Sequence, residues 1–304
     1  MLAEALHHLG ARPNTLILYA SDLVGLNDSS SSSPTQRLLF QATHLYNAHT
    51  EPVDASLLAS TSPLSDPTWC HSSTKLLAFN QTRYVRVLSL DADATLLQPM
   101  DELFLLPPAV RVAMPRAYWL QNETTTTLSS SVLLATPDVK EFERLRERVA
   151  LQREGEFDME VVNALYGEAC MVLPQRPYLL LSGDVRRKEG RGLYFGDGEG
   201  GGDGGGWDAR RALGEVRYVH FSDWPVPKPW MAGADAFLEG EVVGCGDGEA
   251  RMGEREAECR DKEAWVGLYR GFRERRRVSL LLFSWPSLEG ISGSPLRVSE
   301  VVPC

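Results

Sequence analysis

The chain has 304 residues, 43% of them hydrophobic and 24% charged, and its formal net charge at pH 7 is −10. This length and composition suit a globular protein with a full hydrophobic core. The acidic balance argues against a nucleic-acid-binding protein, because no basic stripe would attract a phosphate backbone. No window holds the roughly 18 to 20 apolar residues of a membrane-spanning helix, and the N-terminus lacks the basic region of a signal peptide.

The first ninety or so residues alternate between helical and extended patterns. The predicted elements are helices over 2–9, 35–48 and 74–80, strands over 15–20 and 84–90, and an extended piece near 51–54. Pro34 suits the first turn of the second helix. Ser73 or Thr74 suits the N-terminal cap of the third.

The middle of the chain continues the alternation. Strands are predicted over 109–114 and 131–136, and helices over 138–153 and 158–166. Asp158 opens the last of these helices, where an acidic residue is favourable. Strands that alternate with helices predict an α/β fold with a mainly parallel sheet flanked by helices.

The C-terminal part of the chain has weaker patterns. A Gly-x-Gly-x-x-Gly match within 196–206 follows no clear strand and carries acidic residues that would repel a pyrophosphate, so we interpret it as a low-complexity insertion. We expect one folded domain over 1–232, with this insertion, and a helical and irregular extension over 233–304. A helix is predicted near 264–277, and its Arg-rich stretch 273–277 is interpreted as a solvated face.

The cysteines and glycosylation sequons give information on the cellular compartment of the protein. The five cysteines are Cys70, Cys170, Cys245, Cys259 and Cys304. Cys245 and Cys259 are close enough in sequence to form a lumenal disulfide, and free thiols fit the spacing equally well. Asn-x-Ser/Thr sequons, which favour the secretory pathway, occur at Asn27, Asn80 and Asn122.

Two acidic residues follow the predicted strand 84–90 directly. Asp91 and Asp93 are separated by one alanine and stand at its C-terminal end, where open α/β sheets hold ligands. Carboxylate oxygens suit hard divalent cations such as Mg²⁺ and Mn²⁺, and such ions neutralise phosphates. The pair therefore predicts metal-assisted chemistry on a phosphorylated substrate.

One interpretation of this pair is an aspartate-nucleophile phosphatase of the haloacid-dehalogenase type. Asp91-Ala-Asp93-Ala-Thr95 fits the Asp-x-Asp-x-Thr pattern of that class, with Asp91 as the nucleophile. That class carries the motif on its first strand and needs a later acidic pair for magnesium. Asp184 is the single late candidate.

A second interpretation accounts for more of the chain. Lys75 and the segment 90–104, together with the segment 219–230, closely resemble the glycogenin-like glycosyltransferases of family 8. The later segment is similar to that family's His-x-x-Gly-x-x-Lys-Pro-Trp signature, and its Trp-Pro-Val-Pro sequence is closest to fungal N-acetylglucosaminyltransferase-like members. The resemblance covers about 1–232. It implies a GT-A-type nucleotide-diphospho-sugar transferase fold.

The resemblance also implies a metal site. Asp91, Asp93 and His220 would bind Mn²⁺ or Mg²⁺, and Lys228 would neutralise the diphosphate of a UDP-sugar together with the ion. Asp91 would thereby also contact the bound donor through the metal. His220 as a simple strand cap remains the alternative.

Further residues would face the donor sugar. By the resemblance, Ser129 and Ser130 lie in the donor-contacting segment, with Ser129 where the family has Asn and Ser131 where it has Gly. Asp158 would lie near the reacting centre, with a plain helix cap as its alternative. Lys75 would contact the donor, and a solvated helix face is the alternative for it.

Two departures from the family bear on completeness. The spacing from His220 to Lys228 is two residues longer than in glycogenin itself. The chain also opens on a helix at Met1 where the family begins with a uridine-binding strand. We therefore expect a fold that lacks its first strand. Any membrane anchor would lie upstream, absent from this chain.

These patterns lead to one predicted function. It is a metal-dependent, retaining glycosyltransferase that transfers a sugar from a UDP-sugar, UDP-GlcNAc or UDP-glucose, to a glycan acceptor. The full-length protein is expected in the Golgi or the secretory-pathway lumen. The alternatives are the phosphatase and a truncated, non-catalytic remnant of a glycosyltransferase, and the oligomeric state stays open.

Overall fold

The computed structural model describes residues 1–21, 34–58, 72–120, 126–187, 191–195, 207–231, 233–243 and 252–281. The Gly-rich insertion 196–206, the sequons at Asn27 and Asn122, and Cys245 lie outside these residues. Cys170 and Cys259 are free thiols. Among the described helices, none combines the length and the apolar content that a membrane crossing requires.

The strands of the described residues form three separate sheets. They are β1 (Leu16–Ala20), β2 (His49–Val53), β3 (Val87–Leu90), β4 (Ala94–Leu96), β5 (Val112–Pro115), β6 (Val132–Ala135), β7 (Met171–Leu173), β8 (Leu180–Leu181) and β9 (Tyr218–His220). Their order is β1-β2 in the first sheet, β3-β6-β5-β7 in the second and β4-β9-β8 in the third. Four predicted strands are confirmed, because β1, β3, β5 and β6 overlap the predicted ranges 15–20, 84–90, 109–114 and 131–136.

The α/β class is confirmed, but the sheets mix the two strand directions. Pairs β1/β2, β5/β7 and β8/β9 are parallel, whereas β3/β6, β5/β6 and β4/β9 are antiparallel. A parallel pair needs a long crossover, usually a helix. Within the described residues, the link from β5 to β6 contains only η6 (Tyr118–Leu120). Without a crossover helix, β6 runs back beside β5.

Helices surround these sheets. The α-helices are α1 (Leu2–His8), α2 (Pro34–Tyr46), α3 (Val139–Ala150), α4 (Asp158–Tyr166), α5 (Gln175–Tyr178), α6 (Ser182–Arg186), α7 (Arg191–Phe195), α8 (Ala209–Glu215), α9 (Ala234–Val243) and α10 (Met252–Leu281). One-turn to three-turn 3₁₀ segments are η2 (Ala55–Leu58), η4 (Ser72–Asn80) and η5 (Asp101–Leu105). The predicted helices are confirmed, except that 74–80 is a 3₁₀ segment rather than an α-helix and that 264–277 is the centre of the much longer α10.

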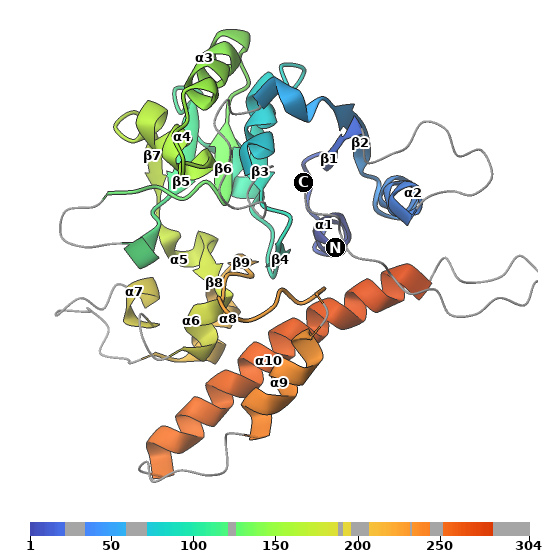
Figure 1. Cartoon of the computed structure of the whole chain (residues 1–304), viewed down its shortest axis with the longest axis vertical. Helices are drawn as coiled ribbons and strands as arrows, with labels where there is room; N and C mark the ends of the chain where they lie inside the picture. The colour runs from blue at the N-terminus through green and yellow to red at the C-terminus, as the bar shows by residue number, and fades with distance from the viewer. Residues whose placement is uncertain are drawn as a thin grey trace, which may run out of the picture.

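The buried side chains gather in two main clusters. One joins η4 to α3 and α4 through Leu77, Phe142 and Val161. The other joins β4 and β9 to α10 through residues such as Phe221 and Trp265. Figure 1 shows α3 and α4 beside β5 and β6, and α9 against α10 below the sheet that contains β4. The division at residue 232 stays a prediction, but α10 shares the core of the strands that precede it.

The Arg-rich stretch of α10 differs from its predicted role. Only part of it is a solvated face: Arg277 is 66% exposed and pairs with Glu274. Arg273 and Arg275 instead turn inward and donate hydrogen bonds to Pro229 and Thr95. Sequence periodicity did not predict this because long arginine side chains can reach across a helix surface to acceptors on another element.

A buried tyrosine makes the stability of the fold sensitive to alkaline pH. The Tyr118 hydroxyl donates to Asp184 at 2.5 Å and accepts from the Leu181 amide at 2.9 Å. Burial and the Asp184 carboxylate raise the pKa of Tyr118 well above its ordinary value. Above pH 10 the unfolded chain therefore loses a proton that the folded chain keeps, so stability is complete below pH 10 and falls as the pH rises.

Tyr118→Phe is expected to reduce the free energy of unfolding at pH 7 by about 1–3 kcal/mol, because phenylalanine cannot donate to Asp184. Above pH 10 the free energy of unfolding of the wild type should decline by up to ~1.4 kcal/mol per pH unit because of Tyr118, and the variant should lack this contribution. Urea unfolding from pH 7 to 11 measures both effects. The same alkaline slope in the variant and the wild type would contradict the assignment.

Candidate active site

Asp91 and Asp93 lie in the turn that leads from β3 to β4. The Asp91 amide donates to the Ser131 carbonyl at 3.3 Å, which continues the β3/β6 pairing by one residue. Ala94 then pairs with His220 across the antiparallel β4/β9 ladder. The two strands thus bring His220 to the carboxylates, and one ligand atom of each of these three side chains lies within 4.8 Å of the others.

Asp93 is held by two partners, an imidazole and an ammonium. His220 Nε2 lies 2.9 Å from Oδ1, and Lys228 Nζ donates to Oδ2 at 2.8 Å. Burial would raise the pKa of Asp93, but the hydrogen bond and charge of His220 and the charge of Lys228 outweigh it and hold this pKa well below its usual range. Asp93 is therefore ionised at neutral pH. His220 contacts a carboxylate instead of acting as a simple strand cap.

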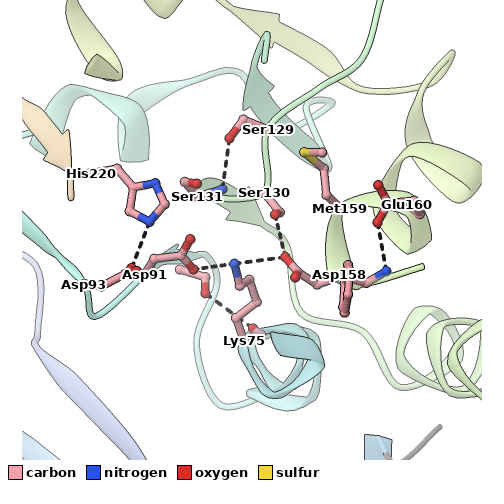
Figure 2. A network of polar contacts seen from close by, with 12 residues as sticks. Lys75, Asp91, Asp93, Ser129, Ser130, Ser131, Asp158, Met159, Glu160 and His220 are labelled. Atoms are coloured by element: carbon pink, nitrogen blue, oxygen red, sulfur yellow. Dashed lines mark hydrogen bonds and ion pairs between the residues drawn. The ribbon is translucent and has the colours of Figure 1, made fainter. Parts of the chain in front are cut away.

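Lys75 links the other two carboxylates of the site. Its ammonium, from η4, forms ion pairs with Asp91 and with Asp158, the latter at 2.9 Å (Figure 2). Burial lowers the pKa of Lys75, yet the charges of the two aspartates outweigh that effect and raise the pKa above its ordinary value. With its side chain 16% exposed, Lys75 is not a solvated helix-face residue.

Asp158 opens α4 without serving as its cap. The N-cap residue is Phe157, and the Asp158 carboxylate instead accepts from Ser130 Oγ at 2.5 Å and pairs with Lys75. Figure 2 shows these residues facing one another between η4 and the segment before β6. Asp158 is thereby linked through Lys75 to Asp91, a member of the candidate metal group.

The serines in the segment before β6 make different contacts. Ser129 is 1% exposed, and its hydroxyl accepts from the Ser131 amide at 3.3 Å, so it stabilises its own turn. Ser130 reaches Asp158. Asn163 of α4, to which the sequence assigned no role, accepts from the Leu128 amide at 2.8 Å and donates to the Leu128 carbonyl at 2.7 Å. An amide side chain among the apolar residues of a helix was the available signal.

The structure gives the phosphatase interpretation no support. It needed Asp184 as a second acidic ligand, but this residue is buried in α6 and accepts the hydrogen bond from Tyr118. The described residues bring Asp91, Asp93 and His220 together as a group able to hold a metal, and Asp184 is not a member.

The three ligands fit a divalent cation. One ligand atom of each residue lies within 4.8 Å of the others, so the three side chains could hold one ion between them. Two carboxylates and an imidazole form a mixed set that Mn²⁺ accepts. An incoming ion would replace at least one of the contacts that Asp93 makes with His220 and Lys228.

Solved structures and named relatives are similar to this chain. A galactosyltransferase LgtC in complex with donor and acceptor sugar analogues covers 84% of this chain and 92% of its own, at 15% identity and a TM-score of 0.46. The bifunctional glycosyltransferase WbbM has 13% identity and a TM-score of 0.49 over 74% of this chain and 49% of its own. No family model matches the chain.

Two relatives cover most of the chain. Glucose N-acetyltransferase 1 of Gibberella zeae is 39% identical over 279 residues, which are 91% of this chain, and the chain spans 58% of that protein's length. Glucose N-acetyltransferase 1 of Aspergillus fumigatus is 39% identical over 290 residues, 91% of this chain and 72% of the relative. The predicted likeness to fungal N-acetylglucosaminyltransferase-like proteins is thus confirmed, and the chain belongs to the family of the proteins named glucose N-acetyltransferase 1.

Proposed function

We propose that this chain is the catalytic part of a metal-dependent, retaining glycosyltransferase. Its donor is a UDP-sugar, UDP-GlcNAc or UDP-glucose, and its acceptor is a glycan in the lumen of the Golgi or the secretory pathway. The observation that supports this most is the meeting of Asp93, His220 and Lys228 at one point, because it joins a metal-ligand set to a cation suited to a diphosphate.

Each group has a chemical task in this proposal. Asp91, Asp93 and His220 would hold a Mn²⁺ or Mg²⁺ ion, which would supply Lewis-acid stabilisation to the leaving diphosphate. Lys228 donates to the oxygens of that diphosphate and offsets the charge that develops as the sugar bond breaks. Lys75 orients Asp91 and Asp158, and Ser130 donates to Asp158, so this carboxylate is held in one position toward the sugar.

The relatives' name describes acetyl transfer, which makes a different demand on the site. An acyl donor releases no diphosphate, so it would leave the cluster of Asp91, Asp93, His220 and Lys228 without a task. We therefore favour sugar transfer. The two activities are separable by their donors and by their need for metal.

A donor comparison tests the proposal. The chain is incubated with UDP-GlcNAc, UDP-glucose or acetyl-CoA, with Mn²⁺ or with EDTA, and the release of UDP or CoA is measured. We expect UDP release that requires Mn²⁺. His220→Ala should lower both Mn²⁺ affinity and UDP release at least about tenfold, whereas His44→Ala, on the exposed side of α2, should change neither.

Two outcomes would overturn the proposal. Metal-independent CoA release that survives His220→Ala would favour acetyl transfer. A chain that unfolds cooperatively but binds neither Mn²⁺ nor UDP by calorimetry would favour the non-catalytic remnant.

Asp158→Asn tests the residue proposed to face the sugar. The amide keeps the shape of the side chain but loses the ion pair with Lys75. We expect kcat to fall about tenfold or more and the affinity for UDP to change little, because Asp158 acts at the sugar and not at the diphosphate. Steady-state kinetics and calorimetry with UDP measure the split, with the exposed Glu168→Gln as a control. A loss of UDP affinity equal to the loss of kcat would contradict this role.

A further inference from the structure

Helix α10 contacts chain neighbours of three active-site residues. Arg275 Nη2 donates to Thr95 Oγ1 at 2.8 Å, and Thr95 lies two residues after Asp93. Phe272 packs against Phe221, the residue after His220. Arg273 Nη1 donates to the carbonyl of Pro229, the residue after Lys228, at 2.9 Å.

The aromatic part of this contact is buried. The Phe221 ring lies 5.1 Å from the rings of Tyr269 and Phe272, edge to face with both. Trp230, at the far end of the same loop, lies 5.7 Å from Phe272. Edge-to-face pairs add about 0.5–1.5 kcal/mol beyond area burial. The loop from Phe221 to Trp230 is therefore held at both ends by one helix.

The arginine contact reaches the strand pair that carries the metal ligands. Thr95 is 2% exposed and pairs with Val219 in the β4/β9 ladder. In the same ladder, Ala94 pairs with His220, and the Phe221 amide donates to the Asp93 carbonyl at 2.9 Å. A shift of Thr95 would move Asp93 and His220 relative to each other.

We propose that α10 is a positioning element of the metal and diphosphate site, with Arg275 as the positioning residue for the metal ligands and Arg273 for the Lys228 loop. The inference rests on the proposed function, because it concerns the same metal and donor. Residues that orient metal ligands from outside typically contribute 10–100-fold to metal affinity. The contact with Thr95 places Arg275 in this class, whereas Arg273 acts on the Lys228 loop and not on a metal ligand.

Three single variants of the same helix test the inference. Mn²⁺ affinity without donor, UDP affinity with saturating Mn²⁺ and the thermal unfolding midpoint are measured for each. Arg275→Met is expected to weaken Mn²⁺ binding at least about tenfold. Arg273→Met should leave Mn²⁺ binding unchanged and weaken UDP binding. Arg277→Met, which removes only an exposed pair with Glu274, should change neither affinity.

Two further variants separate positioning from general destabilisation. Arg275→Lys retains a donor and should recover part of the Mn²⁺ affinity. If Arg275 acts through Thr95, the double variant Thr95→Val/Arg275→Met should bind Mn²⁺ no more weakly than the weaker single variant.

The outcomes distinguish this inference from the proposed function. Wild-type chain that binds Mn²⁺, with Arg275→Met equal to it, overturns the role of α10 and leaves the function intact. Additive losses of Mn²⁺ affinity in the double variant also overturn it. So does a result in which Arg273→Met and Arg275→Met each lose Mn²⁺ and UDP affinity equally, in proportion to a lowered thermal stability. A wild-type chain that binds neither Mn²⁺ nor UDP overturns the function and this inference with it.

Discussion

Replacing Lys75 with methionine is expected to reduce the free energy of unfolding by about 3–5 kcal/mol, since removal of one partner leaves buried charges uncompensated. Lys75 is the cation between Asp91 and Asp158, whose side chains are 15% and 7% exposed. Methionine fills a similar volume but carries no charge. The two carboxylates would then face each other with no cation between them.

Added Mn²⁺ should restore part of this loss. An ion bound to Asp91 supplies positive charge where the ammonium stood, so the variant should gain more stability from Mn²⁺ than the wild type does. Urea unfolding with and without Mn²⁺ measures both effects, and the exposed Lys140→Met is the matched control. Unfolding curves of Lys75→Met that coincide with those of the control would show that the ion pairs contribute nothing.

Lys228→Met is expected to have two effects of opposite sign. In the structure the ammonium donates to Asp93 and to the Phe221 carbonyl. It therefore competes with a metal ion for the same carboxylate. Without donor, the variant should bind Mn²⁺ up to about fivefold more tightly, the magnitude of a partly exposed ion pair. Turnover should fall by about 10²–10³, because the leaving diphosphate loses a preorganised donor.

Calorimetry with Mn²⁺ alone and kinetics with a UDP-sugar measure the two effects on the same protein. Lys140→Met again serves as the control. If Mn²⁺ affinity falls together with turnover, Lys228 orders the ligands and does not compete with the metal. If neither changes, Lys228 has no part in the site.

Local patterns were sufficient for most of the secondary structure. The spacing of apolar residues predicted β1, β3, β5, β6 and the helices α3 and α4, because burial of one face or of a whole strand requires that spacing. The short strands β4, β8 and β9 were not predicted. Each has two or three residues, too few for a pattern, and each is stabilised by pairing with a distant partner.

The candidate site was also only partly predictable from local sequence. Asp91 and Asp93 could be identified from the strand before them, and His220 and Lys228 from a second motif. Sequence alone left open whether His220 and Asp93, 127 residues apart, meet. The β4/β9 pairing decides this, since the side chains at the ends of two paired strands must be neighbours.

The sequence by itself determined the α/β class, the candidate metal-ligand residues and the family of this protein, because each is encoded in short runs of neighbouring residues. The tertiary structure alone decided that Lys75 bridges Asp91 and Asp158 and that Arg275 reaches Thr95, 180 residues away. The local sequence around a charged residue is the same whether its side chain is solvated or paired. Only the packing of distant elements removes it from water and supplies its partner.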